Sequence, residues 1–274
     1  MQIRRIAAVV VGTFLATSSA GLRGQETPDG TVFNYVEIKI KAGHNAQWEN
    51  AWKQINAQRL KYHRPYPYSV WEGEDNRYLF LTPLKDLPEF VTGWQAANQE
   101  VTKQAQAAKD PPTPPTAQFQ EYSNRWWLQW HPEWSYTPAN PRLKPAEIGF
   151  VHWDIYYLPS GSVLTGLSAD EETKAGLPAA ATVLDQLAAL YQTRGLPDGL
   201  KVYSDFLGIG PEVPFRIVST TALDEKDFNI RRAQIQETLG LEGLRLLARL
   251  ASVARRIDSI NFKIRRDLSY RWGN

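Results

Sequence analysis

Two short polar pairs, each inside an alternating apolar segment, are the residues best suited to chemistry in this sequence. Glu37 and Lys39 alternate with apolar residues in one segment, and His152 and Asp154 do so in another. Such alternation predicts strands that place each pair on one face of a sheet. A His beside an Asp can act as a general base oriented by a carboxylate, with Lys39 as an electrophilic partner. These four residues are the predicted catalytic group.

The same four residues have a structural interpretation, which the sequence favours. If two sheets pack face to face, the four side chains form a salt-bridge cluster that holds the sheets in register. Ion networks of this kind perturb proton affinities as much as active sites do. Glu37, His152 and Asp154 would also suit a metal ion. That spacing is common by chance, however, and we predict no metal site.

Aromatic residues are dense, with 10 Trp and 12 Tyr in the chain. An aromatic lining suits a ligand with a flat apolar body. On this reasoning Tyr35, Trp130, His131 and Tyr156 are the predicted ligand-binding residues. The alternative is a packed interface between sheets or between chains, where Trp and Tyr are also enriched, and the sequence favours that interface.

The strands that carry these residues belong to an internal repeat. Residues 128–136 (LQWHPEWSY) and 262–270 (FKIRRDLSY) share their apolar positions and end in Ser-Tyr. A second, weaker match lies upstream of each motif, in the same order. A repeat of this length indicates one fold present twice. We place the first repeat at 31–137 and the second at 146–274.

Each repeat shows the periodicity of a strand, a helix, two strands, a helix and a strand. The predicted elements are strand 35–40, a helix capped by Asn45, hairpin strands 68–72 and 77–82, helix 86–108 and strand 118–134, then strand 150–157, helix 180–191, strands 200–207 and 215–220, helix 224–256 interrupted near Gly240 and Gly243, and strand 259–266. This is the order of a ferredoxin-like unit. The predicted fold class is α+β, with two tandem ferredoxin-like units whose antiparallel sheets pack face to face as an α/β barrel.

Aligning the first strands of the two repeats matches Glu37 with His152 and Lys39 with Asp154. This alignment predicts that both polar pairs point away from the helices and meet between the two sheets. A ligand pocket is expected in the same place. A Gly-, Ser- and Asp-rich insertion at 159–176 distinguishes the second repeat.

The order of elements, together with Lys41-Ala-Gly-His44 between the first strand and an amphipathic helix, resembles the dimeric α/β-barrel superfamily. That superfamily includes NIPSNAP-like proteins and antibiotic-biosynthesis-monooxygenase-like proteins. The resemblance implies two facing sheets, and activities that range from cofactor-free oxygenation to haem binding. Haem-binding relatives use a His in the second copy, and this chain has no His after His152. We therefore predict no cofactor.

The N-terminal segment 1–20 has the features of a bacterial secretory signal peptide. Arg4 and Arg5 precede an apolar run that is too short to span a bilayer, and small residues follow at 18–20. The chain has no Cys, so its stability cannot rest on disulfides. We expect a periplasmic or secreted protein without stable membrane insertion after cleavage.

The charge balance argues against a nucleic-acid partner. The formal net charge is +2 in the whole chain. Removing segment 1–20 deletes two Arg and no acid, which leaves a charge of 2 − 2 = 0. The predicted function is therefore binding of an unidentified small molecule. The alternatives are a cofactor-independent monooxygenase or isomerase acting on a small aromatic or polyketide-like substrate, and a structural homodimer with no ligand.

Overall fold

The strands form a closed antiparallel barrel in the computed structural model, which describes residues 32–159, 180–206 and 214–271. The strand order around the barrel is β1-β3-β2-β8-β5-β7-β6-β4. Strands β1 to β4 are therefore contiguous in one half of the barrel, and β5 to β8 in the other. The chain is an α+β protein, as predicted. The predicted signal segment 1–20 and nearly all of the insertion at 159–176 lie outside the described residues.

The described elements agree closely with the predicted order. They are β1 (Val32–Ile40), α1 (Asn45–Lys61), β2 (Ser69–Glu72), β3 (Arg77–Leu84), α2 (Leu87–Glu89), a π-helical turn (Phe90–Trp94), α3 (Gln95–Ala107), β4 (Gln120–Trp130), a 3-10 turn (Pro132–Trp134), β5 (Phe150–Tyr157), α5 (Ala180–Thr193), β6 (Lys201–Asp205), β7 (Phe215–Ala222), α6 (Glu225–Val253) and β8 (Arg256–Ile264).

Two short seams close the barrel. At one, β2 pairs with β8, and at the other β4 pairs with β6. Each seam is extended by a Tyr of the repeated Ser-Tyr motif, because Tyr136 bridges to Leu200 and Tyr270 bridges to Tyr68. The motif therefore joins the end of each half to the other half. Its recurrence in the sequence reflects this shared role in closure.

Apolar and aromatic side chains fill the inside of the barrel. All eight strands contribute to this buried cluster, which contains Phe33, Tyr35, Trp71, Leu79, Leu81, Leu128, Trp130, Val151, Trp153, Ile155, Tyr203, Ile217 and Phe262. Trp153 lies at its centre, 1% exposed, and its ring contacts those of Trp71, Tyr35 and Phe262. The space between the sheets, where we expected a ligand pocket, is therefore a packed core.

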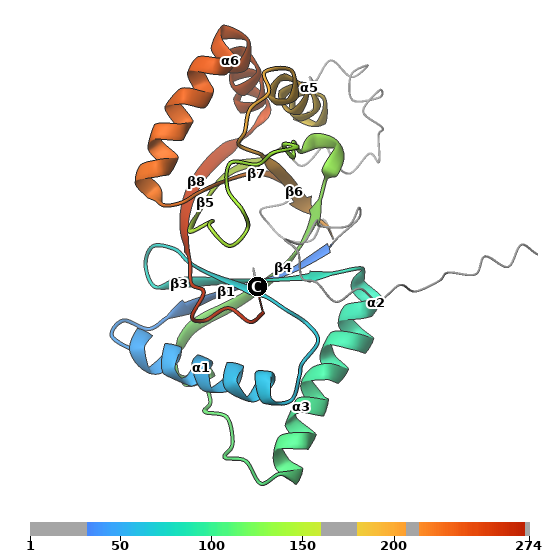
Figure 1. The fold of residues 1–274 in the computed structure, drawn as a ribbon, viewed down its shortest axis with the longest axis vertical. Coiled ribbons are helices and arrows are strands. Elements are labelled where there is room, and N and C mark those ends of the chain that lie inside the picture. The colour runs from blue at the N-terminus through green and yellow to red at the C-terminus, as the bar shows by residue number, and fades with distance from the viewer. Residues whose placement is uncertain (1–31, 160–179, 207–213, 272–274) are drawn as a thin grey trace, which may run out of the picture.

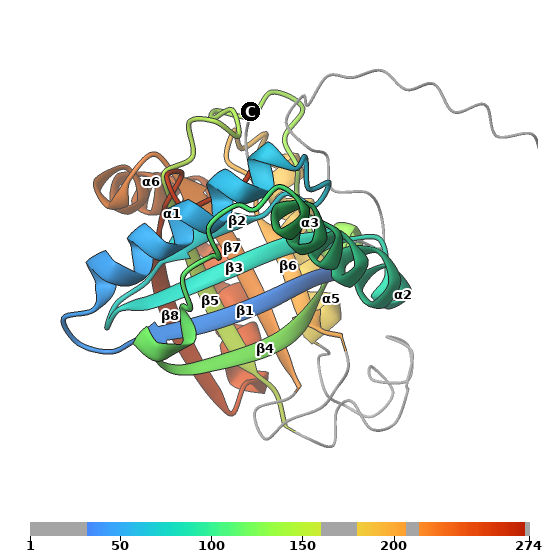
Figure 2. The same ribbon diagram turned by 90° about the horizontal axis from the view of Figure 1, so that it is seen from below.

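Helices cover the outside of both halves (Figure 1). Helix α1 packs on the outer face of β1 to β3 through Trp48, which is fully buried. Helices α5 and α6 pack on β5 to β7, with Leu184 and Leu250 among their buried residues. Seen from below, α1 runs along the β2 and β3 side of the sheet and α3 lies next to it, while β4 forms the opposite side (Figure 2). No helix in the described ranges is both long and apolar enough to cross a membrane.

Three details differ from the sequence prediction. Asn45 does not cap α1; it is the first helical residue, and its side chain donates to Asn76 and Tyr78. The helix expected at 86–108 contains the π-helical turn, although Asp86 does cap its start. The last predicted helix ends at Val253, so Arg256 begins β8 instead. The interruption expected near Gly240 is confirmed, since Gly240 has φ 59° and ψ −152°.

Candidate functional site

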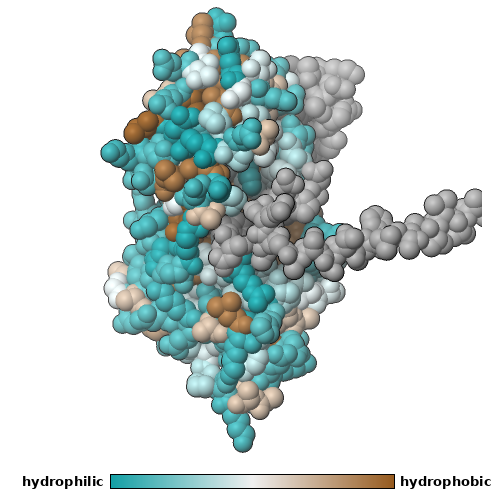
Figure 3. Space-filling view, in the orientation of Figure 1, coloured by the Kyte–Doolittle hydropathy of each residue, from teal (hydrophilic) through white to brown (hydrophobic). Residues whose placement is uncertain are grey.

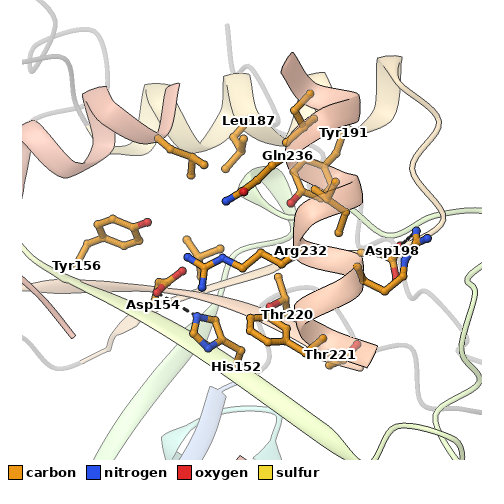
Figure 4. A pocket seen from close by; sticks show the side chains of 17 residues that line it. His152, Asp154, Tyr156, Leu187, Tyr191, Asp198, Thr220, Thr221, Arg232 and Gln236 are labelled. Carbon is orange, nitrogen blue, oxygen red and sulfur yellow. Dashed lines mark hydrogen bonds and ion pairs between the residues drawn. The ribbon is translucent and has the colours of Figure 1, made fainter. Parts of the chain in front are cut away.

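A pocket lies between the outer face of the second half of the sheet and the two helices that cover it (Figure 4). We call it the α6 pocket. Strands β5 and β7 form its floor, through His152, Asp154, Tyr156, Val218 and Thr220, while α5 and α6 form its walls. Its cavity volume is about 100 Å³. It is therefore smaller than the roughly 300 to 1,000 Å³ of sites for drug-sized ligands.

His152 and Asp154 form a hydrogen-bonded pair on this floor. Nε2 of His152 lies 3.1 Å from Oδ1 of Asp154, and Nδ1 lies 2.7 Å from Oδ1 of Asn261 on β8. The hydroxyl of Ser259 donates to the same Asp154 oxygen at 2.5 Å. The imidazole also stacks on Phe228 of α6, with ring centroids 4.5 Å apart. Hydrogen bonds to both ring nitrogens and the stacking on Phe228 therefore fix the orientation of the His152 ring.

Both ring nitrogens of His152 are occupied. Because a carboxylate only accepts, Nε2 must carry a proton toward Asp154. If the Asn261 oxygen faces Nδ1, that nitrogen is protonated as well and the ring is an imidazolium. If the Asn261 amide is turned over, its NH₂ donates to Nδ1 and the ring is neutral. In either arrangement no nitrogen is available to take a substrate proton. In this geometry His152 donates its Nε2 proton to Asp154.

Asp154 is the ionised carboxylate on the floor of the pocket. Although burial opposes its ionisation, the hydrogen bonds from His152 and Ser259 hold its pKa below the ordinary value. The positive charge of Arg232 acts in the same direction. Figure 4 shows the Arg232 side chain extending from α6 toward Asp154. The pocket therefore presents a carboxylate and a guanidinium against mainly apolar walls.

A salt-bridge network beside the pocket fixes the first half of α6. Arg231 binds Asp198, and Arg142 binds both Asp198 and Asp227, with N–O distances of 2.8 Å for each Arg142 contact. Asp227 is in α6, Asp198 precedes β6 and Arg142 precedes β5. These bonds hold the start of α6 against two connecting segments, and Arg232 is the next residue after Arg231. The network therefore stabilises the wall that carries Arg232.

The hydroxyl groups of Tyr156, Tyr191 and Thr220 are also part of the polar lining. Burial and the charge of Asp154 raise the pKa of Tyr156, and burial together with Asp198 raises that of Tyr191. Both phenols stay protonated near neutral pH and can donate a hydrogen bond. Oγ1 of Thr220 is buried and has no hydrogen-bond partner in the described part of the chain. Buried polar atoms are usually satisfied, so this hydroxyl is an available hydrogen-bonding group of the pocket lining.

The predicted meeting of four ionisable residues is wrong. Glu37 follows Tyr35 on the inner side of β1, where its carboxylate accepts from Tyr122 at 2.9 Å and lies 3.8 Å from Arg77. Lys39 forms an ion pair with Glu121 at the end of the same strand. His152 and Asp154 instead face α6. The proposed metal set of Glu37, His152 and Asp154 is divided by the sheet for the same reason, and no cluster of three His, Asp or Glu within the described ranges could hold a metal ion.

Of the four predicted ligand-binding residues, only Tyr156 lines the α6 pocket. Tyr35 and Trp130 belong to the packed barrel interior. His131 lies just beyond β4 and contacts Ser204 of β6 and Glu133. The aromatic density therefore reflects core packing, as the alternative interpretation held.

The sequence prediction missed the contribution of α6. Phe228, Arg232 and Gln236 recur at intervals of four and all line the pocket. This spacing places them on one helical face, which is the available signal. Tyr191 of α5 also belongs to the wall of the pocket.

The α6 pocket does not fit a haem. Its single His is His152, and both nitrogens of that ring are already bonded. Its cavity volume of about 100 Å³ is also far below that of sites for drug-sized molecules.

Comparison with known proteins supports the fold. No family profile matches the sequence, and no curated protein sequence does. Solved structures do match. A proposed monooxygenase from Fusobacterium nucleatum aligns with a TM-score of 0.52 and 7% identity, over 86% of this chain and 93% of that one. An anthrone oxidase-like protein aligns with a TM-score of 0.51 and 11% identity, over 87% and 92%. Chlorite dismutase from Candidatus Nitrospira defluvii in complex with imidazole aligns with a TM-score of 0.51 and 9% identity, over 88% and 93%.

This chain shares with these neighbours an α+β fold built on an antiparallel barrel. The resemblance predicted from the order of elements is therefore confirmed. At identities of 7 to 11% the similarity establishes the fold alone. Function has to be argued from the pocket itself.

Proposed function

We propose that this protein binds a small molecule in the α6 pocket, and that the molecule has an apolar body and a hydrogen-bond donor for Asp154. The single observation that carries this proposal is an ionised carboxylate on the floor of an otherwise mainly apolar pocket. A cavity of about 100 Å³ has room for roughly three water molecules, or for a comparably small organic group. An alcohol or an amine with a branched apolar tail satisfies both requirements.

A matched series of ligands tests this proposal. Isobutanol, isobutylamine and isobutyrate have the same tail and offer a neutral donor, a cation and an anion. Asp154 on the floor should favour the first two, whereas isobutyrate should bind best if the guanidinium of Arg232 determines binding instead. Because ligands this small bind weakly even in good sites, we expect Kd values on the order of millimolar. The measurement is chemical-shift titration of the mature chain.

The control is a second aspartate. Asp154→Asn should weaken isobutylamine binding at least tenfold, whereas Asp185→Asn, on the exposed face of α5, should not change it. Equal binding of all three ligands, or no effect of Asp154→Asn, would refute the proposal. Melting temperatures of both variants establish that they are folded.

A second candidate function is cofactor-independent oxygenation or isomerisation of a small aromatic or polyketide-like substrate. The ionised Asp154 supports it as a general base, and two fold neighbours are named as a proposed monooxygenase and an anthrone oxidase-like protein. The small cavity places this candidate second. Oxygen uptake with an anthrone as substrate, lost in Asp154→Asn, would promote it, and no uptake would exclude this reaction.

The sequence carries further proposals about organisation and location. The order of elements supports two tandem ferredoxin-like units at 31–137 and 146–274. The Arg pair, apolar run and small residues of segment 1–20 support export to the periplasm or beyond. Mass spectrometry of the secreted chain would test the proposed export, since cleavage after Ala20 leaves Gly21 as the first residue.

A structural homodimer is the third proposal. The exposed large apolar residues on and near α6 support it, and these are Leu223, Ile230, Leu241, Leu244 and Ile257. On the face shown in Figure 3, brown hydrophobic residues are separated by hydrophilic ones. Scattered apolar residues are usual on monomers. Sedimentation equilibrium distinguishes a monomer from a homodimer directly.

A further inference from the structure

Ser204, His131 and Glu133 form a line of hydrogen-bonded side chains at the seam between β4 and β6. Nε2 of His131 lies 2.8 Å from the hydroxyl of Ser204, and Nδ1 lies 2.8 Å from Oε1 of Glu133. A hydroxyl, an imidazole and a carboxylate in this order are the arrangement that activates a serine nucleophile. We call these three residues the Ser204 cluster.

The chain holds the imidazole firmly. His131 follows the last residue of β4, and its backbone N–H donates to Val202 of β6 at 2.9 Å. The ring stacks on Trp134, with centroids 4.0 Å apart and an angle of 17° between the planes. Pro132 opens a 3-10 turn that brings Glu133 back to the ring. His131 is therefore fixed between a carboxylate and a hydroxyl.

The hydrogen bonds favour the tautomer that a base requires. The Glu133 carboxylate can only accept, so Nδ1 of His131 carries the proton. Nε2 is then free to accept from the Ser204 hydroxyl. Burial lowers the pKa of His131, while Glu133 opposes this shift. The ring is therefore neutral at pH 7 and able to take a proton.

A cation lies beside the hydroxyl. Arg216 is opposite Ser204 in the antiparallel pair of β6 and β7, so the two side chains are neighbours on one face. Its guanidinium lies 5.2 Å from the centre of the Trp134 ring. Acyl transfer places negative charge on the carbonyl oxygen in its transition state, and a nearby cation stabilises that charge.

We propose that Ser204 is a nucleophile toward small carboxylic esters, with His131 as general base and Glu133 as its positioning residue. Oγ of Ser204 attacks the carbonyl carbon while its proton passes to Nε2 of His131. The C–O bond to the leaving alcohol then breaks, and the alcohol oxygen takes that proton. Water attacks the acyl-serine in the same way, with His131 again as base, which releases the carboxylic acid and restores the Ser204 hydroxyl.

The surroundings of Ser204 limit the substrate. Ser204 is 5% exposed, whereas the side chain of Glu133 is 55% exposed. Because the nucleophile is nearly buried, the proposal assigns it small acyl groups such as acetyl. This site is on a different strand pair from the α6 pocket and does not depend on it.

One competing arrangement must be distinguished. The Ser204 hydroxyl also lies 3.0 Å from the carbonyl oxygen of Asp205. If it donates there, Nε2 of His131 donates to Ser204 instead, and both ring nitrogens then carry a proton, because Nδ1 already donates to Glu133. This arrangement requires an imidazolium, which the burial of His131 disfavours. The same three residues would then form a structural hydrogen-bond chain without an activated oxygen.

Labelling of the full mature chain with diisopropyl fluorophosphate separates these arrangements, because only an activated serine reacts. We expect a single phosphoryl adduct, which peptide mapping places on Ser204, together with hydrolysis of p-nitrophenyl acetate. His131→Gln should slow labelling by roughly 10² or more, the usual contribution of a general base. Ser252→Ala, an exposed serine of α6, is the control and should leave the rate unchanged.

The pH profile tests the roles of the imidazole and carboxylate. The labelling rate should rise with pH and level off, with a midpoint below the ordinary His value of about 6.5. Glu133→Gln should move this midpoint lower still, because Glu133 raises the pKa of His131. No adduct on Ser204 in the folded wild-type protein, or labelling that His131→Gln leaves unchanged, would overturn the proposal. The wild-type experiment requires no variant, so misfolding cannot obscure it.

Discussion

Ser135 and Ser269 make the same pair of hydrogen bonds at the two seams of the barrel. Oγ of Ser135 accepts from the backbone N–H of Val202 at 2.9 Å and donates to the carbonyl of His131 at 2.6 Å. Oγ of Ser269 accepts from Val70 N–H at 2.9 Å and donates to the carbonyl of Arg265 at 2.8 Å. Each serine therefore provides a hydrogen-bond acceptor for one backbone N–H near the start of a strand in the other half of the barrel. The strand is β6 for Ser135 and β2 for Ser269.

Replacing either serine should destabilise the barrel. Ser269→Ala leaves the N–H of Val70, a fully buried residue, without its acceptor, and such a loss costs about 1–3 kcal/mol. Ser135→Ala should cost a similar amount through Val202. The measurement is urea unfolding of the mature chain, with Ser252→Ala as a control expected within about 0.5 kcal/mol of wild type. Values near that control for both seam serines would contradict the assigned role.

The strands could be predicted from the sequence because their alternation is strict. Strand β5 was expected at residues 150–157 and occupies Phe150–Tyr157. The Ser-Tyr motif, from which we inferred a repeat in the sequence, occurs at both seams of the barrel. Its function in closing the barrel was not predictable, because the motif forms its bonds to Leu200 and Tyr68, far away in the sequence.

The error in the predicted site arose from the alignment of the two repeats. Leu128 and Phe262 occupy equivalent positions of the Ser-Tyr motif, and they pair with Phe33 and Val151 respectively. By this register His152 corresponds to Asn34, three positions from Glu37. An odd shift moves a residue to the other face of a strand. The predicted polar pairs were therefore placed on one side of the sheet although they lie on opposite sides.

The helical part of the site was hidden for a different reason. Phe228, Arg232 and Gln236 share a helical face, but so do Arg245 and Arg249, which are exposed. Spacing alone does not distinguish a face that covers a pocket from one that faces solvent. Only the packing of α6 over β5 makes that distinction.

Acid should weaken the protein through Asp154. Its pKa is lower in the folded chain than in the unfolded one, so its ionised form contributes stability above the unfolded value of about 3.9. Hydrogen bonds to a charged group are worth roughly 1.5–3 kcal/mol. We therefore expect wild type to exceed Asp154→Asn in free energy of unfolding by about 1–2 kcal/mol at pH 7. The difference should vanish as the pH falls through the folded pKa.

Unfolding of both proteins between pH 7 and pH 3 checks this expectation. Asp185→Asn, at an exposed site, serves as the comparison and should follow wild type across the range. A difference between wild type and Asp154→Asn that stays constant down to pH 3 would show that Asp154 does not titrate below its ordinary range.

The barrel interior should be tightly packed, so that loss of a central side chain strongly destabilises the protein. Trp153 is 1% exposed and its indole N–H donates to Ser219 at 3.0 Å. Trp153→Ala removes a ring surrounded by others and should cost about 3–5 kcal/mol. Trp126→Ala, at a site that is 37% exposed, should cost markedly less. Thermal unfolding measures both, and a small loss in Trp153→Ala would indicate that the interior is loosely packed.

The kink in α6 at Gly240 should contribute both to the stability of the protein and to ligand affinity in the α6 pocket. Gly240 has φ 59° and ψ −152°, a conformation that residues with a Cβ rarely adopt. Leu239 and Leu247 lie on opposite sides of the kink in the chain, and both line the α6 pocket. Gly240→Ala should therefore cost about 1–3 kcal/mol and reduce isobutylamine affinity as the second part of α6 shifts.

A second glycine provides the matched control. Gly43, before α1, also has a positive φ of 79°, and no heavy atom beyond its chain neighbours lies within 4 Å of the position that a Cβ would take. Gly43→Ala should cost stability through the same backbone strain but leave isobutylamine binding unchanged, because it lies on the first half of the barrel. If both variants lose stability and neither loses affinity, the kink shapes the helix without shaping the pocket. Loss of affinity in Gly240→Ala alone would tie the backbone of α6 to the binding of the ligand.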